Sequence, residues 1–398
     1  MNFLYKTKGD VVLWMVVILL SCVGILAVYS STGTIAFTMY EGNTEAKMLK
    51  HFAIVILGIF FIYVCHLIDF RIYSRLSLFL VIVAAPLLLY TLIWGVDIND
   101  AKRWINLPII NQTFQTSDLA KLALIMFVAR QLSRVQDDIK DFKKAFLPIL
   151  LWVVGICSLI APANLSTAAV LFATSLILMF IGRISIKYIS MVFLAGIGAL
   201  SILVLLAFTF PKAISRFDTW KHRIETYMEN DEGGSYQNQQ AKIAIASGGL
   251  IGKGPGNSTQ RNFLPHPYSD FIFAIILEEY GLIGGFIVIS LYLLFLFRCI
   301  RIVIKSPRAF GALLAAGLAF SLVIQAFINM GVAVNVFPVT GLPMPLVSMG
   351  GTSILFHSIS FGIILSVSRS VEDRPEEQEK QIVQKSDDDL QNMIIQPA

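Results

Sequence analysis

Charged residues are scarce in this chain. Only 14% of its 398 residues are Asp, Glu, Lys or Arg, whereas soluble domains contain about 25%. Hydrophobic residues make up 56% of the sequence, and the mean hydropathy is +0.73. This composition excludes an ordinary soluble protein and indicates a protein that crosses a membrane several times.

Paired cysteines and a cleavable leader are also missing. The four cysteines are spaced singly through apolar segments, without the spacing of a disulfide framework or a zinc site. The first apolar run, residues 11–32, is too long for the hydrophobic region of a signal peptide. We therefore expect the cysteines to be small buried apolar residues and the first run to remain as a membrane anchor.

Long apolar runs dominate what is present. A single crossing needs about 20 apolar residues, and runs of that length begin near Val11, Phe52, Leu76, Leu119, Ala145, Ser166, Tyr188, Phe271, Ala309 and Ser348. The sequence therefore predicts an all-α polytopic membrane protein with about ten transmembrane helices.

Basic residues are distributed unevenly between the loops. With the N-terminus in the cytoplasm, the inner loops hold clusters such as Lys140, Lys143 and Lys144, whereas the short outer loops hold few, among them Arg103. This asymmetry satisfies the positive-inside rule and predicts that both termini are cytoplasmic. The net charge of +5 follows from this distribution, so no nucleic-acid partner is expected.

The chain divides into a transmembrane domain and a tail. We expect the domain to cover residues 1–369, with a large extracytoplasmic loop at 211–269 between helices seven and eight. A connection of that length is normally functional or disordered, and its aromatic residues, such as Trp220 and Tyr227, favour order. Residues 370–398 are polar and poor in aromatics, which predicts a disordered cytoplasmic tail.

The centre of the large loop is rich in glycine, with the sequence "SGGLIGKGPGNSTQ" at 247–260. It is not a nucleotide-binding P-loop, because Lys253 is followed by Gly254 rather than Ser or Thr. Two readings remain. The segment is a flexible loop, or its backbone approaches a ligand closely while Lys253 and Arg261 offer cations to a phosphate.

Charges also occur in an earlier outer loop and in the run that follows it. Arg103 beside Trp104 is either an interfacial anchor or a ligand contact. Ser117 is the expected helix N-cap, with Asp118 in the first turn, where the helix dipole favours an anion. Lys121 lies one turn deeper in the membrane, so it either snorkels to the surface or belongs to a functional site.

Two further stretches point to a cavity. Prolines and glycines crowd "VNVFPVTGLPMPLVSMGGTS", 334–353, so this stretch cannot be a regular helix and should line a cavity. The stretch "DFIFAIILEEYG" places Asp270 at the start of an apolar run and two glutamates inside it. On a helix that starts at Asp270, Glu278 lies within about 80° of it and Glu279 lies opposite. The residues alone thus predict an outward-facing cavity with a carboxylate at its mouth and cations nearby.

Several stretches together resemble the SEDS family (shape, elongation, division and sporulation) of peptidoglycan polymerases. They are "AKRWI", "QTSDLAK", "IASGGLIGKGPGNSTQ", "LPHPYSDFIFAIILEEYGLIG" and "NMGVAVNVFPVTGLPMPLVSMGGTS", in the family's order and spacing. The chain departs from the family pattern at Asp100, where glycine is common, at "QTSD" and at "SMGGTS". Its first run and last motif look more like the division-type subfamily, FtsW, than the elongation-type subfamily, RodA.

The resemblance implies a glycosyltransferase that polymerises lipid II at the outer face of the bacterial cytoplasmic membrane for septal wall synthesis. A sugar hydroxyl is a weak nucleophile, so a general base is needed, and the family's catalytic aspartate falls on Asp270. The departing lipid diphosphate needs cations, for which Arg103, Lys253 and Arg261 are candidates. Gln260, Asp118 and Lys121 complete the predicted substrate-binding set, and we expect Lys121 to pair with Asp270 across the cavity mouth.

The resemblance also implies partners. They are a class B penicillin-binding transpeptidase, other division proteins and the surrounding membrane lipid. No cofactor is required by any motif, and a divalent cation, Mg²⁺ or Mn²⁺, is an open alternative although no metal-ligand motif is present. Three rival readings are a lipid II flippase, a non-catalytic scaffold that recruits a transpeptidase, and a RodA-type elongation polymerase.

Overall fold

The computed structural model describes residues 9–32, 44–98, 101–107, 112–209 and 236–372. Each of the ten predicted runs contains a helix. These helices are α2 (Val11–Ser31), α4 (Thr44–Leu67), α5 (Phe70–Trp94), α6 (Thr116–Arg134), α7 (Leu147–Ile160, preceded by the π-helix Phe142–Phe146), α8 (Leu165–Ile181), α9 (Ile186–Thr209), α12 (Ile272–Lys305), α13 (Ala309–Ala333) and a C-terminal helix (Thr352–Glu372).

The helices confirm the predicted class. Eight of those in the described residues are long and apolar enough to cross a membrane, and α8 is a shorter apolar helix. α6 is not among the eight, because Asp118, Lys121, Arg130 and Arg134 interrupt its apolar sequence. The chain is therefore an all-α, multi-pass membrane protein in which one helix carries an unusual number of charges.

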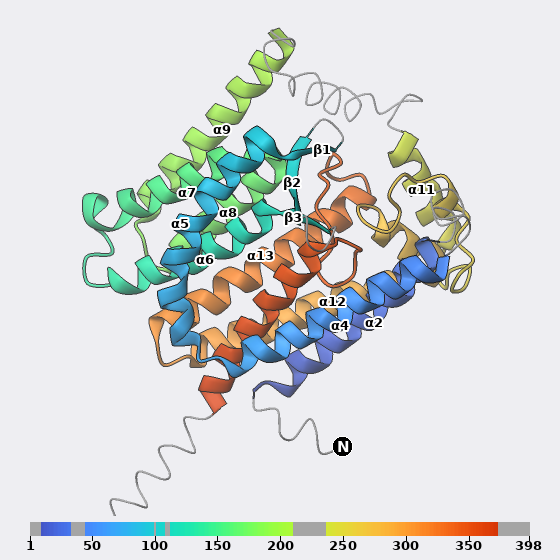
Figure 1. The fold of residues 1–398 in the computed structure, drawn as a ribbon, viewed down its shortest axis with the longest axis horizontal. Helices are drawn as coiled ribbons and strands as arrows, with labels where there is room; N and C mark the ends of the chain where they lie inside the picture. Colours follow the sequence, from blue (N-terminus) through green and yellow to red (C-terminus); the bar gives the residue numbers. More distant parts are fainter. Residues whose placement is uncertain (1–8, 33–43, 99–100, 108–111, 210–235, 373–398) are drawn as a thin grey trace, which may run out of the picture.

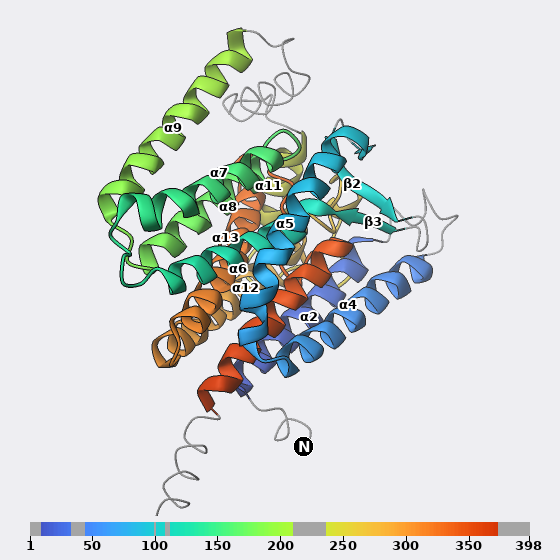
Figure 2. The same cartoon turned by 60° about the vertical axis from the view of Figure 1, so that its left-hand side comes forward.

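α6 and α13 occupy the middle of the bundle (Figures 1 and 2). Nearly every side chain of α6 between Leu122 and Leu132 is buried, and most of α13 is buried as well. The buried polar residues of these two helices, such as Asp118, Gln325 and Asn329, therefore face other helices rather than lipid. Burial at this depth is costly unless each group has a partner.

The two ends of the bundle differ. At one end the first and last described residues meet: Gly9 N donates to Glu372 Oε2 at 2.8 Å, and Asp10 N donates to Ser368 Oγ at 2.7 Å. Arg298 Nε donates to Asp10 Oδ2 at 2.8 Å, which ties α12 to the same end. We call this the terminus end. The opposite end carries a small sheet and the helix α11 (Tyr236–Gly248), and we call it the loop end (Figure 1).

A three-stranded antiparallel sheet at the loop end was not predicted. Its strands are β1 (Val96–Ile98), β2 (Ala101–Leu107) and β3 (Gln112–Gln115), in the order β1-β2-β3. Trp104 of β2 pairs with Gln115 of β3. β3 leads directly into α6, so the helix begins at Thr116 with Gln115 as its N-cap. The predicted cap, Ser117, instead accepts a hydrogen bond from Gln115 Nε2 at 3.0 Å.

The stretch between α13 and the C-terminal helix is irregular, as its prolines and glycines predicted. Residues 334–351 contain no helix. Four of its residues, Asn335, Gly341, Leu346 and Gly351, have positive φ angles of 60°, 69°, 62° and 55°. Met344, Val347 and Ser348 are nevertheless buried. The segment therefore folds back into the protein at the loop end, and we call it the irregular segment.

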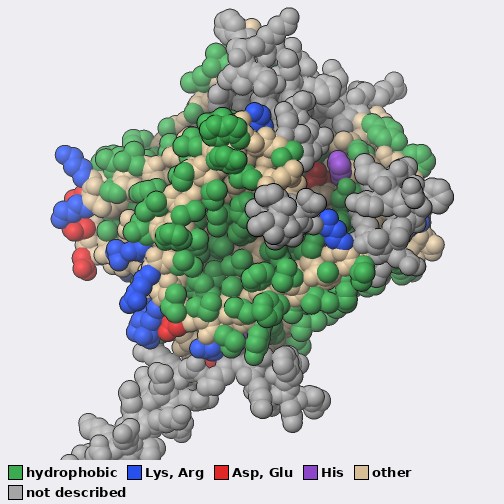
Figure 3. Space-filling view, in the orientation of Figure 1, with side chains coloured by type: hydrophobic (Ala, Val, Ile, Leu, Met, Phe, Trp, Pro, Cys, Tyr) green, Lys and Arg blue, Asp and Glu red, His purple; other side chains and the backbone are tan. Residues whose placement is uncertain are grey.

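The outer surface fits a membrane protein. Apolar side chains cover most of the visible face, while Lys and Arg gather along its lower left margin (Figure 3). α9 projects away from the bundle (Figure 1) and exposes apolar side chains such as Leu194 and Leu205. Two expected segments lie partly outside the described residues. They are the first part of the large loop, 211–235, with Trp220 and Tyr227, and residues 373–398 of the tail, whose first residues, 370–372, are helical.

Candidate functional site

Asp270 lies in a turn just before α12, which begins at Ile272. The irregular segment donates hydrogen bonds to the backbone of the two residues before Asp270. Met349 N donates to Tyr268 O at 2.8 Å, and Ser348 Oγ donates to Ser269 O at 2.7 Å. Asp270 is partly exposed, and its carboxylate accepts a hydrogen bond from Ser269 Oγ at 3.2 Å. The candidate carboxylate is thus presented by a backbone that the irregular segment fixes.

Asn329 on α13 also holds this turn. We call residues 268–270, together with the donors that bind their backbone, the Asp270 seat. Its Nδ2 lies 3.2 Å from Asp270 O, 3.5 Å from Ser269 O and 2.9 Å from Leu342 O. One amide therefore connects the Asp270 turn to the irregular segment. Asn329 belongs to a motif that predicted an irregular backbone, but its own role was not recognised from sequence.

Lys121 does not form the predicted pair with Asp270. Its Nζ lies 2.8 Å from Asp118 Oδ1, one turn back on α6, and 3.2 Å from Gln325 Oε1 on α13. Asp118 Oδ2 accepts a 2.6 Å hydrogen bond from Ser353 Oγ. The local partner prevails because Asp118 is itself buried, with its side chain 2% exposed, and an unpaired buried carboxylate is strongly unfavourable.

The pair belongs to a polar cluster that sequence reasoning found only in part. Gln325 Nε2 donates to Pro343 O at 2.7 Å and lies 3.1 Å from His357 Nε2. Both residues sit in apolar helices, so the signal that singled out Lys121, a polar group at membrane depth, applied equally to them. A pocket lies against the cluster, lined by Asp118, Lys121, Gln325, Phe356, His357 and Ser360 among others.

The cluster and the Asp270 seat are connected through α13. Gln325 and Asn329 are four residues apart, so they lie on one face of the helix. Gln325 binds Lys121 and Pro343 O, and Asn329 binds Leu342 O and Asp270 O. The predicted partners Lys121 and Asp270 are therefore linked through these two amides and the irregular segment instead of by direct contact.

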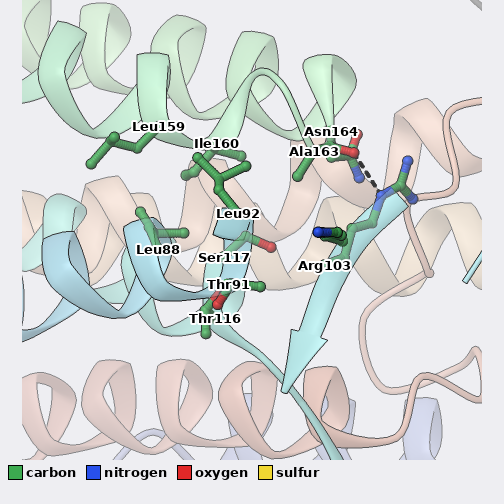
Figure 4. A pocket seen from close by; sticks show the side chains of 11 residues that line it. Leu88, Thr91, Leu92, Arg103, Thr116, Ser117, Leu159, Ile160, Ala163 and Asn164 are labelled. Atoms are coloured by element: carbon green, nitrogen blue, oxygen red, sulfur yellow. Dashed lines mark hydrogen bonds between the residues drawn. The ribbon is translucent and has the colours of Figure 1, made fainter. Parts of the chain in front are cut away.

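Arg103 reaches the same region from the sheet. Its Nε donates to Ala163 O, in the turn between α7 and α8, at 2.7 Å. A Cβ on Gly341 would lie 3.7 Å from its Nη1, so its guanidinium is next to the irregular segment. Figure 4 shows Arg103 at the edge of a pocket with an apolar side made by Leu88, Leu159 and Ile160. A cation above apolar walls suits the phosphate end of a lipid.

Lys253, Gln260 and Arg261 form a second group, at the glycine-rich loop. Lys253 Nζ lies 2.6 Å from Glu278 Oε1, and Gln260 N donates to Glu278 Oε2 at 3.2 Å. Arg261 Nη1 donates to Ser30 O at 2.9 Å, and Ser30 in turn donates to Glu279. The positive charge of Lys253 is therefore already balanced by a buried carboxylate.

The expected placement of the two glutamates assumed a helix that starts at Asp270, whereas Asp270 lies in the turn before α12, which starts at Ile272. The expected angles between Asp270 and each glutamate therefore do not apply. Glu278 and Glu279 both reach the glycine-rich loop, just before α12 breaks at Gly281 (φ 66°, ψ −167°). Ser258 Oγ donates to Glu278 at 2.5 Å, and Ser258 N donates to Glu279 at 3.1 Å.

The described residues do not form a ready-made binding site for a divalent cation. The part of the chain that the structure describes holds no group of three or more His, Cys, Asp or Glu side chains placed to bind a metal ion. Mg²⁺ commonly uses one or two carboxylates together with substrate phosphates. These residues alone do not form such a site, so we derive no chemical step through a metal.

Comparison with known proteins is consistent across sequence and fold. The sequence model of a family described as cell cycle protein, covering FtsW, RodA and SpoVE, matches residues 10–373. Stage V sporulation protein E of Bacillus subtilis (strain 168) is 33% identical over 92% of this chain and 98% of that protein. A protein named probable peptidoglycan glycosyltransferase FtsW, from Coxiella burnetii, is 32% identical over 90% of this chain and 96% of that protein.

Solved structures share the fold. A chain from a structure described as structural coordination of polymerization and crosslinking by a peptidoglycan synthase complex gives a TM-score of 0.71, at 23% identity, over 92% of this chain and 98% of that chain. The rod shape determining protein RodA of Thermus thermophilus gives a TM-score of 0.65, also at 23% identity, over 93% of this chain and 99% of that chain. The overall helix arrangement of this chain therefore belongs to a fold seen before.

Proposed function

This chain belongs to the cell cycle protein family of FtsW, RodA and SpoVE, the SEDS family, and from that premise we propose that it is an FtsW-type peptidoglycan glycosyltransferase that polymerises lipid II. Its relatives of similar length include several named as probable peptidoglycan glycosyltransferases. The chain covers nearly all of each of these relatives, so the proposal concerns the whole protein.

The observation that carries the proposal is the seat of Asp270. Donors from Ser348, Met349 and Asn329 hold the backbone of this turn, while Asp270 remains partly exposed. A catalytic group has to be held in place and still be reachable by its substrate. A carboxylate that served only as a helix partner would not need three separate donors to fix the turn before it.

We assign Asp270 as the general base. The 4-hydroxyl of an acceptor GlcNAc attacks the anomeric carbon of a MurNAc, and Asp270 takes the hydroxyl proton. The bond from that carbon to the lipid diphosphate breaks, the diphosphate leaves with the electron pair, and the anomeric configuration changes from α to β. A base is required because the neutral hydroxyl is a weak nucleophile.

Arg103 and Arg261 are the proposed contacts for the leaving diphosphate, with Gln260 beside Arg261. Developing negative charge on the leaving group is stabilised by cations that are already in place. Arg103 borders a pocket whose apolar side, made by Leu88, Leu159 and Ile160, is the proposed position for the start of the lipid chain. Lys253 makes a weaker contact because Glu278 holds it at 2.6 Å, and Asp118 and Lys121 support the site through Gln325.

The setting follows from the same premise. We place the loop end outside the cytoplasm and both termini inside, in the bacterial cytoplasmic membrane. The meeting of Gly9 with Glu372 supports termini on one side, and the basic inner loops support the direction. The proposed partners are a class B penicillin-binding transpeptidase and other division proteins, and the solved complex that describes polymerization together with crosslinking supports the first.

Polymerisation of labelled lipid II by the purified protein with its transpeptidase tests the proposal. We expect the wild type to form glycan strands and Asp270→Asn to form none, at unchanged expression and partner binding. A general base contributes about 100- to 10,000-fold to the rate, so a loss of that size is required. Strand formation by Asp270→Asn at the wild-type rate would rule out the base, and a wild type that only moves lipid II across vesicles would favour the flippase reading.

A further inference from the structure

The glycine-rich loop fills the break in α12. Gly281 interrupts the helix, and its two sides bond to the loop instead of to each other. Lys253 N donates to Glu278 O at 3.0 Å and Gly254 N to Glu279 O at 2.9 Å. In the other direction, Leu282 N donates to Gly249 O at 3.0 Å. The backbone groups that a broken helix would leave unsatisfied are thus satisfied by the loop.

The fit between loop and helix is tight because glycine lies on both sides. A Cβ on Gly252 would lie 2.2 Å from Glu279 O, and a Cβ on Gly281 would lie 2.3 Å from Leu250 O. Both residues also have positive φ angles, 89° and 66°. The glycines that sequence reasoning assigned to flexibility or to ligand approach therefore serve a close packing of two backbones.

Glu278 accepts hydrogen bonds from both ends of the turn 253–260 in the same loop. Its carboxylate, 0% exposed, accepts from Lys253 Nζ at 2.6 Å, Thr259 Oγ1 at 2.9 Å, Thr259 N at 3.1 Å and Ser258 Oγ at 2.5 Å, and Gln260 N adds a 3.2 Å bond. One buried carboxylate thus ties together both ends of the turn between Lys253 and Gln260.

We propose that Glu278 is a positioning residue for substrate binding: it holds the turn 253–260 on the broken helix so that Gln260 and Arg261 face the lipid diphosphate. This inference rests on the proposed function, because it assigns these two residues to the substrate. Phe271 to Leu277 are buried as a block, so the half-helix after Asp270 stays in place without Glu278, whereas the exposed loop does not.

The KM for lipid II distinguishes positioning from a structural role. In Glu278→Gln the side chain keeps its size, but one of its acceptor oxygens becomes a donor that faces other donors. Loss of contacts to the substrate raises KM with little change in kcat, whereas a smaller fraction of folded enzyme lowers kcat alone. We expect KM to rise about tenfold, the scale of one lost charge-assisted hydrogen bond, and Glu278→Asp to recover part of the loss.

Trypsin gives a readout that does not depend on activity. Lys253 and Arg261 are both cleavage sites for trypsin and bracket the turn. Local opening sets the rate of cutting in a folded protein, so cutting after these residues should be about tenfold faster in Glu278→Gln, by the same hydrogen-bond scale. Asp10→Asn is the matched control, because Asp10 is also a buried carboxylate in an ion pair, with Arg298. It lies at the opposite end of α2 from the loop, about 30 Å along that helix.

The outcomes separate this inference from the proposed function. Faster cutting together with a raised KM supports it. Faster cutting with unchanged KM, or unchanged cutting, overturns it, as does a shift of equal size in Asp10→Asn. If Glu278→Gln does not fold, Thr259→Val removes one donor and should give the same two changes at about threefold each, and no change in either overturns the inference. An active Asp270→Asn would defeat the general base while leaving the trypsin result intact.

Discussion

Two lysine–carboxylate pairs in this protein have nearly the same geometry and different surroundings. Lys121 lies 2.8 Å from Asp118, and Lys253 lies 2.6 Å from Glu278. In both pairs the carboxylate is buried. The first pair joins residues one turn apart on α6, whereas the second joins a loop to a helix 25 residues further along the chain.

The surroundings decide what each pair can do. Glu278 also binds the backbone and hydroxyl groups of the loop, so its capacity for hydrogen bonds is filled by protein. Asp118 and Lys121 instead border a pocket together with Gln325 and His357. An ion pair surrounded by protein fixes a structure, and an ion pair beside a pocket is also able to respond to a ligand.

The largest expected effect comes from breaking the pair on α6. Lys121→Ala leaves Asp118 buried without its cation, which costs about 3–5 kcal/mol. It also releases Gln325, which holds Pro343 of the irregular segment. We expect a loss of polymerisation of about 100-fold or more and a lower unfolding temperature in detergent. Lys253→Met should cost less, about 1 kcal/mol, because Glu278 keeps its other donors.

A double variant separates the two contributions of the α6 pair. Replacing a buried ion pair with uncharged residues is often neutral for stability, so Asp118→Asn combined with Lys121→Met should unfold near the wild-type temperature. Its polymerisation should stay low. Full activity in this variant would show that the pair acts through stability alone, and the contrast with Glu278 would disappear.

A smaller effect is expected where the loop meets the broken helix. Gly252→Ala adds a Cβ that would lie 2.2 Å from a backbone oxygen, while Gly256→Ala, at a similar φ of 79°, adds one with nothing within 4 Å. Both changes strain the backbone by about 1–3 kcal/mol, and only the first also forces two backbones apart. Gly252→Ala should therefore be less stable than Gly256→Ala by about 1–3 kcal/mol, measured by thermal unfolding. Equal shifts would mean that the loop does not pack into the break.

The helices were predictable because a membrane restricts the choices. Backbone groups in lipid must bond internally, so long apolar runs become helices, and prolines and glycines at membrane depth mark irregular backbone such as 334–351. The sheet was not predictable, because strands as short as Val96–Ile98 and Gln112–Gln115 have no pattern that separates them from an outer loop.

Candidate site residues could be chosen from the sequence, but the partners that they bind in the structure could not. Charged residues at membrane depth pointed to Lys121, and a family motif pointed to Asp270. Two carboxylates were available to Lys121, and the choice depended on the burial of Asp118, which the order of residues does not reveal. The partners of Glu278 depended on a helix break at Gly281, and a single glycine in a helix seldom causes one.

The smallest effect is expected at Asn329, a neutral buried residue that, unlike the two ion pairs, carries no charge. It holds the turn of Asp270, the proposed general base. In Asn329→Ala, the carbonyl oxygens of Asp270 and Leu342 lose a donor. One buried hydrogen bond contributes about 0.5–1.5 kcal/mol, so kcat should fall about three- to tenfold. KM should not change, because the proposed role of Asp270 is at the acceptor hydroxyl and not at the diphosphate. Gln325→Ala, one turn away, should instead lower stability through Lys121. If Asn329→Ala raised KM and left kcat unchanged, the turn would be part of the substrate-binding surface, and the base would have to be sought elsewhere.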